Sequence, residues 1–223
     1  MAKFSFSAVD SLFSDKLLGT RTNGKLVHDT TYNHKGFLMG AGVIPISIHN
    51  GELLFLFQKT FSGRKTGYLI DFGGGMDEGE NYRAAAVREF VEESDTLYLE
   101  PELHLARRTE PRVSAQIEQV ERLFEQTLST HPQWWCRRAP GNPEKPKDWR
   151  TYFIKFPYRQ LTPINQQWEQ NHSERFKKRR ELHWVSADQL LEIYAKNPNK
   201  LWKRVRQLEG AEALIHELQS NLL

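Results

Sequence analysis

An Asn-Gly pair at positions 50 and 51 separates two apolar runs, and no other feature restricts the fold of this chain as strongly. The runs are Val-Ile-Pro-Ile-Ser-Ile at 43–48 and Leu-Leu-Phe-Leu-Phe at 53–57. Asn and Gly tolerate the positive φ angles of a tight hairpin turn, so the pattern predicts a β-hairpin. Pro45 lacks a backbone N–H, which suits an edge position or a bulge.

Strands and helices alternate through the rest of the sequence. Further strands are predicted at 68–72, followed by three glycines, at 151–156 and at 181–185. Apolar spacing and a Ser-x-x-Gln capping box predict helices at 81–94, 115–129 and 186–194 and from about 201 onward. This alternation, without a linker-like gap, argues for one domain of the α/β (α+β) class.

Two stretches depart from the regular pattern. Residues 1–37 are mixed polar and aromatic, and we expect an N-terminal extension with one short strand, packed on a main domain that spans 38–223. Residues 131–150 contain four prolines, which predicts a Pro-rich loop that is mobile at its centre.

Composition excludes several classes of protein. The 223 residues carry 31 basic and 28 acidic side chains, a net charge of +3, too small to indicate a nucleic-acid binder. Residues 1–100 hold 10 basic and 13 acidic side chains, whereas 101–223 hold 21 and 15. The single cysteine, Cys136, rules out an intramolecular disulfide and favours a reducing cytosol. No apolar stretch is typical of a signal or a membrane span, so we expect a cytoplasmic protein without membrane contact.

Three carboxylates share one face of the helix predicted at 81–94. Glu92 and Glu93 lie three and four residues after Glu89, and unpaired like charges at this spacing destabilise a helix by about 0.2–0.5 kcal/mol per pair. A bound divalent cation would turn this repulsion into a stabilising interaction. Mg²⁺ prefers oxygen ligands and retains waters and substrate phosphates, and the preceding glycines let the backbone approach a ligand closely. The segment therefore favours metal-assisted phosphate chemistry over a merely solvated acidic helix.

Residues 74–96 resemble the signature of the Nudix hydrolase family, Gly-x5-Glu-x7-Arg-Glu-U-x-Glu-Glu-x-Gly-U, where U is a bulky aliphatic residue. The residues in register are Gly74, Glu80, Arg88, Glu89, Phe90, Glu92 and Glu93. Asp95 replaces the glycine and Thr96 the last apolar residue. Asp enters the left-handed conformation more readily than most residues, so we expect Asp95 to follow the helix there at mild cost. Thr96 loses some core packing, which Leu97 compensates.

The resemblance implies an α/β/α sandwich with a mixed sheet and a loop–helix–loop catalytic box. It also implies a hydrolase that cleaves a phosphoanhydride with Mg²⁺ or Mn²⁺ and an attacking water. Carried over by position, Glu92 and Glu93 are the main metal ligands, and the full set of candidates is Gly74, Glu80, Glu89, Glu92 and Glu93.

The same resemblance implies the catalytic roles. Glu89 is the candidate general base, Arg88 would orient it, and Glu92 completes the catalytic set. A carboxylate in that place accepts the proton of a water whose pKa the metal lowers.

The box indicates the reaction but leaves the substrate open. Our first interpretation is a nucleoside diphosphate-linked substrate: a nucleoside triphosphate, a dinucleoside polyphosphate or a nucleotide sugar. Residues 73–76 and 85–89 also resemble the diphosphoinositol polyphosphate branch, although Phe72 replaces its usual proline. RNA 5′-end processing is a further alternative. From another class, the chain could be a catalytically silent binding module. Many Nudix enzymes dimerise, so a homodimer stays open.

Weaker signals concern basic and aromatic residues. Arg64 and Lys65 precede the box and Arg107 and Arg108 follow it, and both pairs are candidate phosphate contacts. The basic run 177–180 is interpreted as a solvated loop, with an anionic partner as the alternative. The pair Trp134–Trp135 is interpreted as an anchor for the Pro-rich loop rather than a base-stacking platform.

Overall fold

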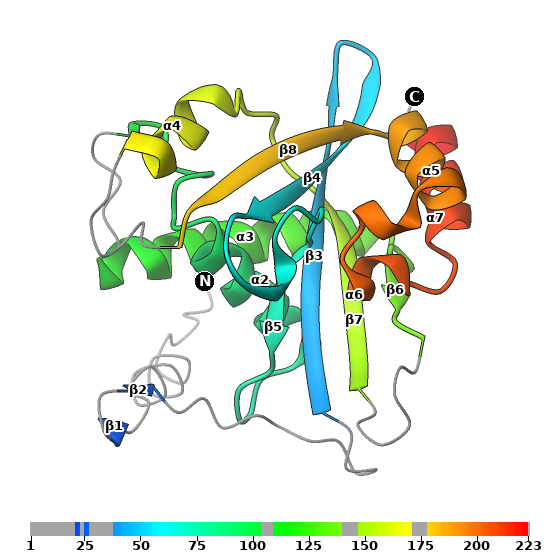
Figure 1. Cartoon of the computed structure of the whole chain (residues 1–223). Coiled ribbons are helices and arrows are strands. Elements are labelled where there is room, and N and C mark those ends of the chain that lie inside the picture. Colours follow the sequence, from blue (N-terminus) through cyan, green and yellow to red (C-terminus); the bar gives the residue numbers. More distant parts are fainter. Residues whose placement is uncertain are drawn as a thin grey trace, which may run out of the picture.

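The computed structural model describes residues 21–22, 25–26, 38–103, 109–139, 147–170 and 178–222. Its centre is a six-stranded mixed sheet in the order β6-β7-β3-β4-β8, with β5 paired to β3 next to β4 (Figure 1). The strands are β3 (Leu38–His49), β4 (Glu52–Thr60), β5 (Phe72–Gly75), β6 (Trp135–Arg137), β7 (Lys147–Lys155) and β8 (Arg180–Ser186). β7 runs parallel to β3, and the other pairs are antiparallel.

The predicted hairpin is confirmed as β3 and β4. Asn50 and Gly51 form its turn with φ angles of 51° and 76°, which few residue types adopt without strain. β3 is the longest strand, and its two edges pair with different elements. One edge carries β7 along its length, and the other carries β5 at its start and β4 at its end.

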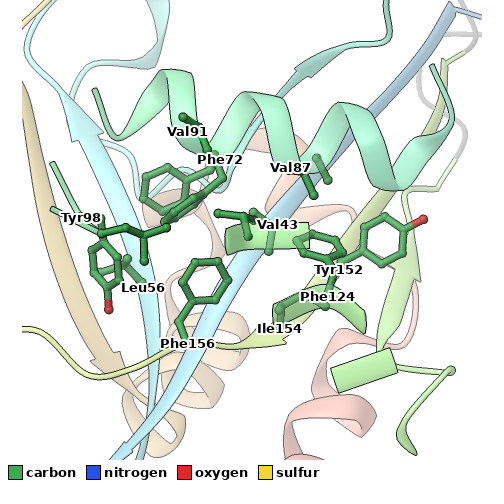
Figure 2. Close-up of a cluster of buried hydrophobic side chains, with 14 of the residues drawn as sticks. Val43, Leu56, Phe72, Val87, Val91, Tyr98, Phe124, Tyr152, Ile154 and Phe156 are labelled. Atoms are coloured by element: carbon green, nitrogen blue, oxygen red, sulfur yellow. The ribbon is translucent and has the colours of Figure 1, made fainter. Parts of the chain in front are cut away.

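Helices cover both faces of the sheet, as an α/β/α sandwich requires (Figure 1). One face carries α2 (Tyr82–Glu93), α3 (Glu110–Thr130) and α4 (Thr162–Gln170), and the other carries α5 (Ala187–Lys196), α6 (Lys203–Arg206) and α7 (Ala211–Leu222). The residues of β3 alternate between the two cores because successive side chains of a strand point to opposite faces. Val43 lies in the α2 core and Ile44 in the α5–α7 core. Figure 2 shows side chains from α2, β3 and β7 meeting in the first of these.

Several predicted boundaries differ from the structure. The strand expected at 68–72 begins at Phe72 and includes the glycines, because these pair with β3, while Leu69 and Ile70 form only isolated bridges. The helix expected at 115–129 starts at Glu110. The helix expected from 201 is divided into α6 and α7, since Gly210 takes a φ of 73° between them.

The loop expected at 131–150 is partly sheet. β6 pairs with β7, and β7 already begins at Lys147, so only 140–146 of this stretch lie outside the described residues. α4 had no clear pattern in the sequence. In the N-terminal segment, Arg21–Thr22 and Lys25–Leu26 form a two-stranded sheet, β1 and β2, rather than one strand. The expected packing of 1–37 on the domain lies outside the described residues. Within the described part of the chain, no helix combines the length and apolar character of a membrane span.

Candidate functional site

β5 and α2 form the two sides of the predicted box, joined by the loop at 76–81. The loop ends at Asn81, whose side-chain oxygen accepts a hydrogen bond from the Ala84 N–H at 2.9 Å and so caps α2. The apolar face of α2 packs against the sheet, where Phe90 meets Phe72 edge to face at 4.9 Å. This packing fixes the rotation of the helix about its axis and therefore the direction of its polar face.

Arg88 connects the polar face of α2 to the loop. Its guanidinium donates to both oxygens of Glu80, at 2.8 and 3.0 Å, and to the Gly75 carbonyl at 2.9 Å. Glu80 also accepts from the Asp77 N–H at 2.9 Å. Because both Glu80 oxygens already have donors, this carboxylate is placed to position Arg88 and the loop.

Glu89 is set directly against the glycine run. A Cβ built on Gly74 would overlap the Glu89 carboxylate, so a side chain at this position would displace that carboxylate. Arg88 Nη1 donates to Glu89 Oε1 at 3.0 Å. Burial and the neighbouring charge of Glu93 raise the pKa of Glu89 to about 7, although Arg88 opposes the shift.

Glu92 and Glu93 are adjacent in sequence but differ in environment. The Glu92 side chain is 33% exposed, and its Oε2 lies 3.4 Å from Arg88 Nη1. Glu93 is buried, where its Oε2 accepts from Gln58 Nε2 at 2.5 Å and from the Gly73 N–H at 2.8 Å. Glu92 is thus the more accessible carboxylate.

Arginines from distant segments neutralise Glu93. Arg180 Nη1 of β8 lies 3.3 Å from Glu93 Oε1. Burial alone would raise the pKa of Glu93, but Arg180 and Arg204 outweigh it and keep the pKa below its usual value. The prediction of a solvated loop at 177–180 is therefore wrong for Arg180, which is buried, while Lys177 lies outside the described residues.

A second buried ion pair lies behind β5. Arg204 of α6 donates to the Asp71 carboxylate and, at 2.9 Å, to the Asp71 carbonyl. Thr151 Oγ1 donates to Asp71 Oδ2 at 3.4 Å. Neither Asp71 nor Arg204 is among the site residues predicted from the sequence. A charged residue inside the apolar run at 68–72 was a signal, because buried carboxylates need a partner.

The other predicted contacts have different outcomes. Arg64 and Lys65 lie in the short helix η1 (Gly63–Lys65), Arg64 exposed and Lys65 half-buried. Burial and the charge of Arg204 lower the pKa of Lys65, while Glu93 opposes this, which indicates that Lys65 lies near the box. Arg107 and Arg108 fall outside the part of the chain that the structure describes.

The anchoring interpretation of the tryptophan pair agrees with the structure. Trp134 is fully buried and stacks on His131 with ring centroids 3.7 Å apart, and Arg150 lies 4.7 Å above the Trp135 ring. Cys136 of β6 is buried in the core on the α5–α7 side of the sheet, and burial raises the pKa of its thiol to about 12, which makes it a poor nucleophile.

Both departures from the Nudix signature follow α2 in the left-handed region. Asp95 has a φ of 52° and Thr96 a φ of 59°. Asp95 tolerates this conformation, as expected, and its Oδ2 accepts from Trp168 Nε1 of α4 at 2.8 Å. Thr96 is β-branched, so its backbone is strained there. Leu97 is fully buried next to it, which agrees with the expected compensation in packing.

The oxygen donors near Gly74 suit a hard divalent cation. Within the described residues, no group of three or more His, Cys, Asp or Glu side chains is arranged so that it could hold a metal ion by itself. Mg²⁺ does not require a preformed cage of protein ligands, because it usually keeps several waters and is also bound by substrate phosphates. Glu89 against Gly74, with Glu92 half-buried nearby, provides oxygen donors of that kind.

Comparison with known proteins assigns the family. The NUDIX domain model matches residues 36–206, and the chain therefore belongs to the Nudix family. It is a hydrolase of that family, with the sandwich fold that the sequence predicted. A search of curated proteins found no match.

Solved structures with similarity to this chain include three Nudix proteins. The Ap4A hydrolase of C. elegans, in a binary complex, is 15% identical over 82% of this chain and 96% of its own, with a TM-score of 0.44. A NUDIX hydrolase from Alicyclobacillus acidocaldarius is 16% identical over 82% and 91%, with a TM-score of 0.40. The NUDIX domain of Shewanella oneidensis NrtR complexed with ADP ribose is 13% identical over 86% and 94%, with a TM-score of 0.35.

Proposed function

We propose that this Nudix hydrolase is a metal-dependent pyrophosphohydrolase that cleaves a phosphoanhydride bond in a nucleoside diphosphate-linked substrate by attack of water. One observation carries the proposal. The carboxylate of Glu89 lies against Gly74, where a side chain would have to displace it, and Arg88 of the same helix holds it there while donating to Glu80 and to the Gly75 carbonyl. A merely solvated acidic helix has no reason to build this arrangement.

A Mg²⁺ or Mn²⁺ ion would be held by Glu92, by Glu89 and by the Gly74 carbonyl. Glu93 adds a ligand through Oε1, since a carboxylate oxygen has more than one lone pair and Arg180 contacts this one at 3.3 Å. When bound, the cation neutralises charge on the phosphate oxygens and lowers the pKa of a bound water. Glu80, whose oxygens already accept from Arg88 and Asp77, serves the site by positioning instead.

Glu89 is the general base in this proposal. A base is most effective when its pKa is close to the working pH, and the pKa of Glu89 is raised to about 7. The Arg88 contact at 3.0 Å holds one carboxylate oxygen and leaves the other to accept the proton of the attacking water. Arg88 is a positioning residue, because its donors are directed at carboxylates and at the Gly75 carbonyl.

The test is turnover by purified protein with Mg²⁺ or Mn²⁺ on a panel of substrates. The panel contains nucleoside triphosphates, dinucleoside polyphosphates, nucleotide sugars, inositol pyrophosphates and triphosphorylated RNA. Glu92→Gln should lower kcat at least about 100-fold, because loss of even an indirect partner of a metal costs about 10–100-fold. Glu118→Gln, on the exposed side of α3, is the matched control and should retain wild-type turnover.

Two results would contradict the proposal. Near-normal turnover by Glu92→Gln would remove the metal assignment. Absence of turnover by the wild-type protein on every substrate, with nucleotide binding retained, would identify a catalytically silent binding module instead.

A further inference from the structure

Three segments that are far apart in the sequence converge next to Gly74. Residues 63–69 are tied to the start of α6, since the Leu69 N–H donates to the Lys200 carbonyl and the Trp202 N–H donates to the Leu69 carbonyl, both at 2.9 Å. The start of β7 joins them through Arg138, whose N–H donates to the Trp149 carbonyl at 3.0 Å and whose Nε donates to Gln207 Oε1, just after α6, at 2.9 Å. Each segment carries basic side chains.

The indole of Trp149 connects these segments to the box. A Cβ built on Gly40 would overlap the Trp149 ring and lie 2.7 Å from the Gly74 carbonyl oxygen, so ring and carbonyl are neighbours. Arg204 lies over the same ring, with Cζ 4.6 Å from its centroid. The ring of Trp149 therefore lies next to both the basic side chain of Arg204 and the Gly74 carbonyl, a proposed metal ligand. Lys147, two residues before Trp149 on β7, shares its side of the sheet.

The result is a group of cations that we call the cationic wall. Its members are Arg64, Lys65, Arg138, Lys147, Lys203 and Arg204. Arg138 and Arg204 are buried, whereas Arg64, Lys147 and Lys203 are exposed. Asp71, the carboxylate in contact with Arg204, is completely buried, so it does not form an ion pair at the surface with Arg64, Lys147 or Lys203.

The charges that act on Lys147 are mainly positive. Burial lowers its pKa, and the next causes are the charges of Arg138, Lys203, Arg204 and Arg64. Cations that face one another in this way cost free energy, which an anionic ligand recovers.

We propose that the cationic wall binds a phosphate group of the substrate in addition to the diphosphate that is cleaved. The preferred substrates then carry three or more linked phosphates, and nucleotide sugars are disfavoured, because neutral sugar hydroxyls cannot neutralise the wall. This inference rests on the proposed function, whose box supplies the cleavage and whose Gly74 adjoins the wall.

Binding of inorganic tripolyphosphate, measured by calorimetry in EDTA, tests the wall without requiring turnover. The double variant Lys147→Gln/Lys203→Gln should bind at least about tenfold more weakly than wild type, and the difference should shrink in high salt. Lys196→Gln, an exposed lysine of α5 paired with Glu192, is the control and should bind as wild type does. Lys147→Arg/Lys203→Arg keeps both charges and should keep the affinity, which separates charge from folding.

Kinetics provide the second measurement. The ratio of kcat/KM for a nucleoside tetraphosphate to kcat/KM for a nucleotide sugar should exceed one in the wild type and fall about tenfold in the glutamine double variant. Tripolyphosphate affinity unchanged in that variant, or a wild-type preference for nucleotide sugars, would overturn the inference. If the wild type binds tripolyphosphate through the cationic wall but hydrolyses no substrate, the proposed function is wrong, while phosphate binding by the wall is supported.

Discussion

The acidic face of α2 and the cationic wall adjoin each other but are built in opposite ways. On the acidic face, the single guanidinium group of Arg88 contacts the carboxylates of Glu80, Glu89 and Glu92. In the wall, Lys147 has cations as its main charged neighbours. The first region is held together before any ligand arrives, whereas the second has like charges that a ligand must neutralise. The comparison suggests that one region sets the reaction and the other selects the substrate.

The two regions also differ in how far their contacts reach along the chain. The partners of Arg88 lie within 13 residues of it. Arg204, in contrast, meets Asp71 across 133 residues, and Arg138 meets Gln207 across 69. A local cluster depends on one loop and one helix, while the wall requires the completed fold.

Removing Arg88 should have the largest effect, because it breaks the local region at its centre. Arg88→Gln leaves four carboxylates, those of Asp77, Glu80, Glu89 and Glu92, without their shared cation. Loss of one partner of a largely buried ion pair costs about 3–5 kcal/mol of unfolding free energy. The kcat should also fall about 10–100-fold, since Glu89 loses its orientation. Urea unfolding and steady-state kinetics measure the two effects.

The control for Arg88 lies on the same helix. Arg83 contacts Glu121 and Glu125 of α3 and is 30% exposed, so Arg83→Gln should cost less than about 1 kcal/mol and leave kcat unchanged. Equal losses in the two variants would show that Arg88 is an ordinary surface contact and would remove the contrast between the two regions.

A smaller effect should appear in the pH dependence of stability in EDTA. The folded state raises the pKa of Glu89 from 4.5 to about 7, so it binds an extra proton between these values. The contribution of Glu89 to the unfolding free energy is therefore fully present below about pH 4.5. This contribution, at most about 3 kcal/mol, is lost as the pH rises through 7.

Glu89→Gln isolates this contribution because it removes only the titrating group. Its unfolding free energy should exceed that of the wild type at pH 8 and approach it at pH 5, while its turnover is lost. The lowered pKa of His183 acts in the opposite direction over part of this range, but it is common to both proteins. A pH-independent difference between the two proteins would show that Glu89 has an ordinary pKa.

What the sequence predicts follows the same division between local and distant contacts. The Asn50–Gly51 turn, the cap at Ser186 and the shared face of Glu89 and Glu92 are all encoded within a few residues, and each was predictable. The burial of Arg180 was not, because its partners belong to β4 and α2. β6 was hidden for a similar reason: a strand of three residues is stable only through its pairing with β7.

The smallest predicted effect concerns the point where the local box meets a distant helix. Asp95 stands where the Nudix signature has glycine, and restoring glycine would relax a φ of 52°. It would also remove the buried hydrogen bond from Trp168 at 2.8 Å, and a hydrogen bond to a charged group contributes about 1.5–3 kcal/mol. Since Asp tolerates the left-handed region at modest cost, the lost contact outweighs the relief, and Asp95→Gly should lower the unfolding free energy by about 1 kcal/mol. Asp95→Asn, which keeps an acceptor and tolerates the same φ, should lose less. Stabilisation by Asp95→Gly in urea unfolding would show instead that backbone strain dominates and that the box ends independently of α4.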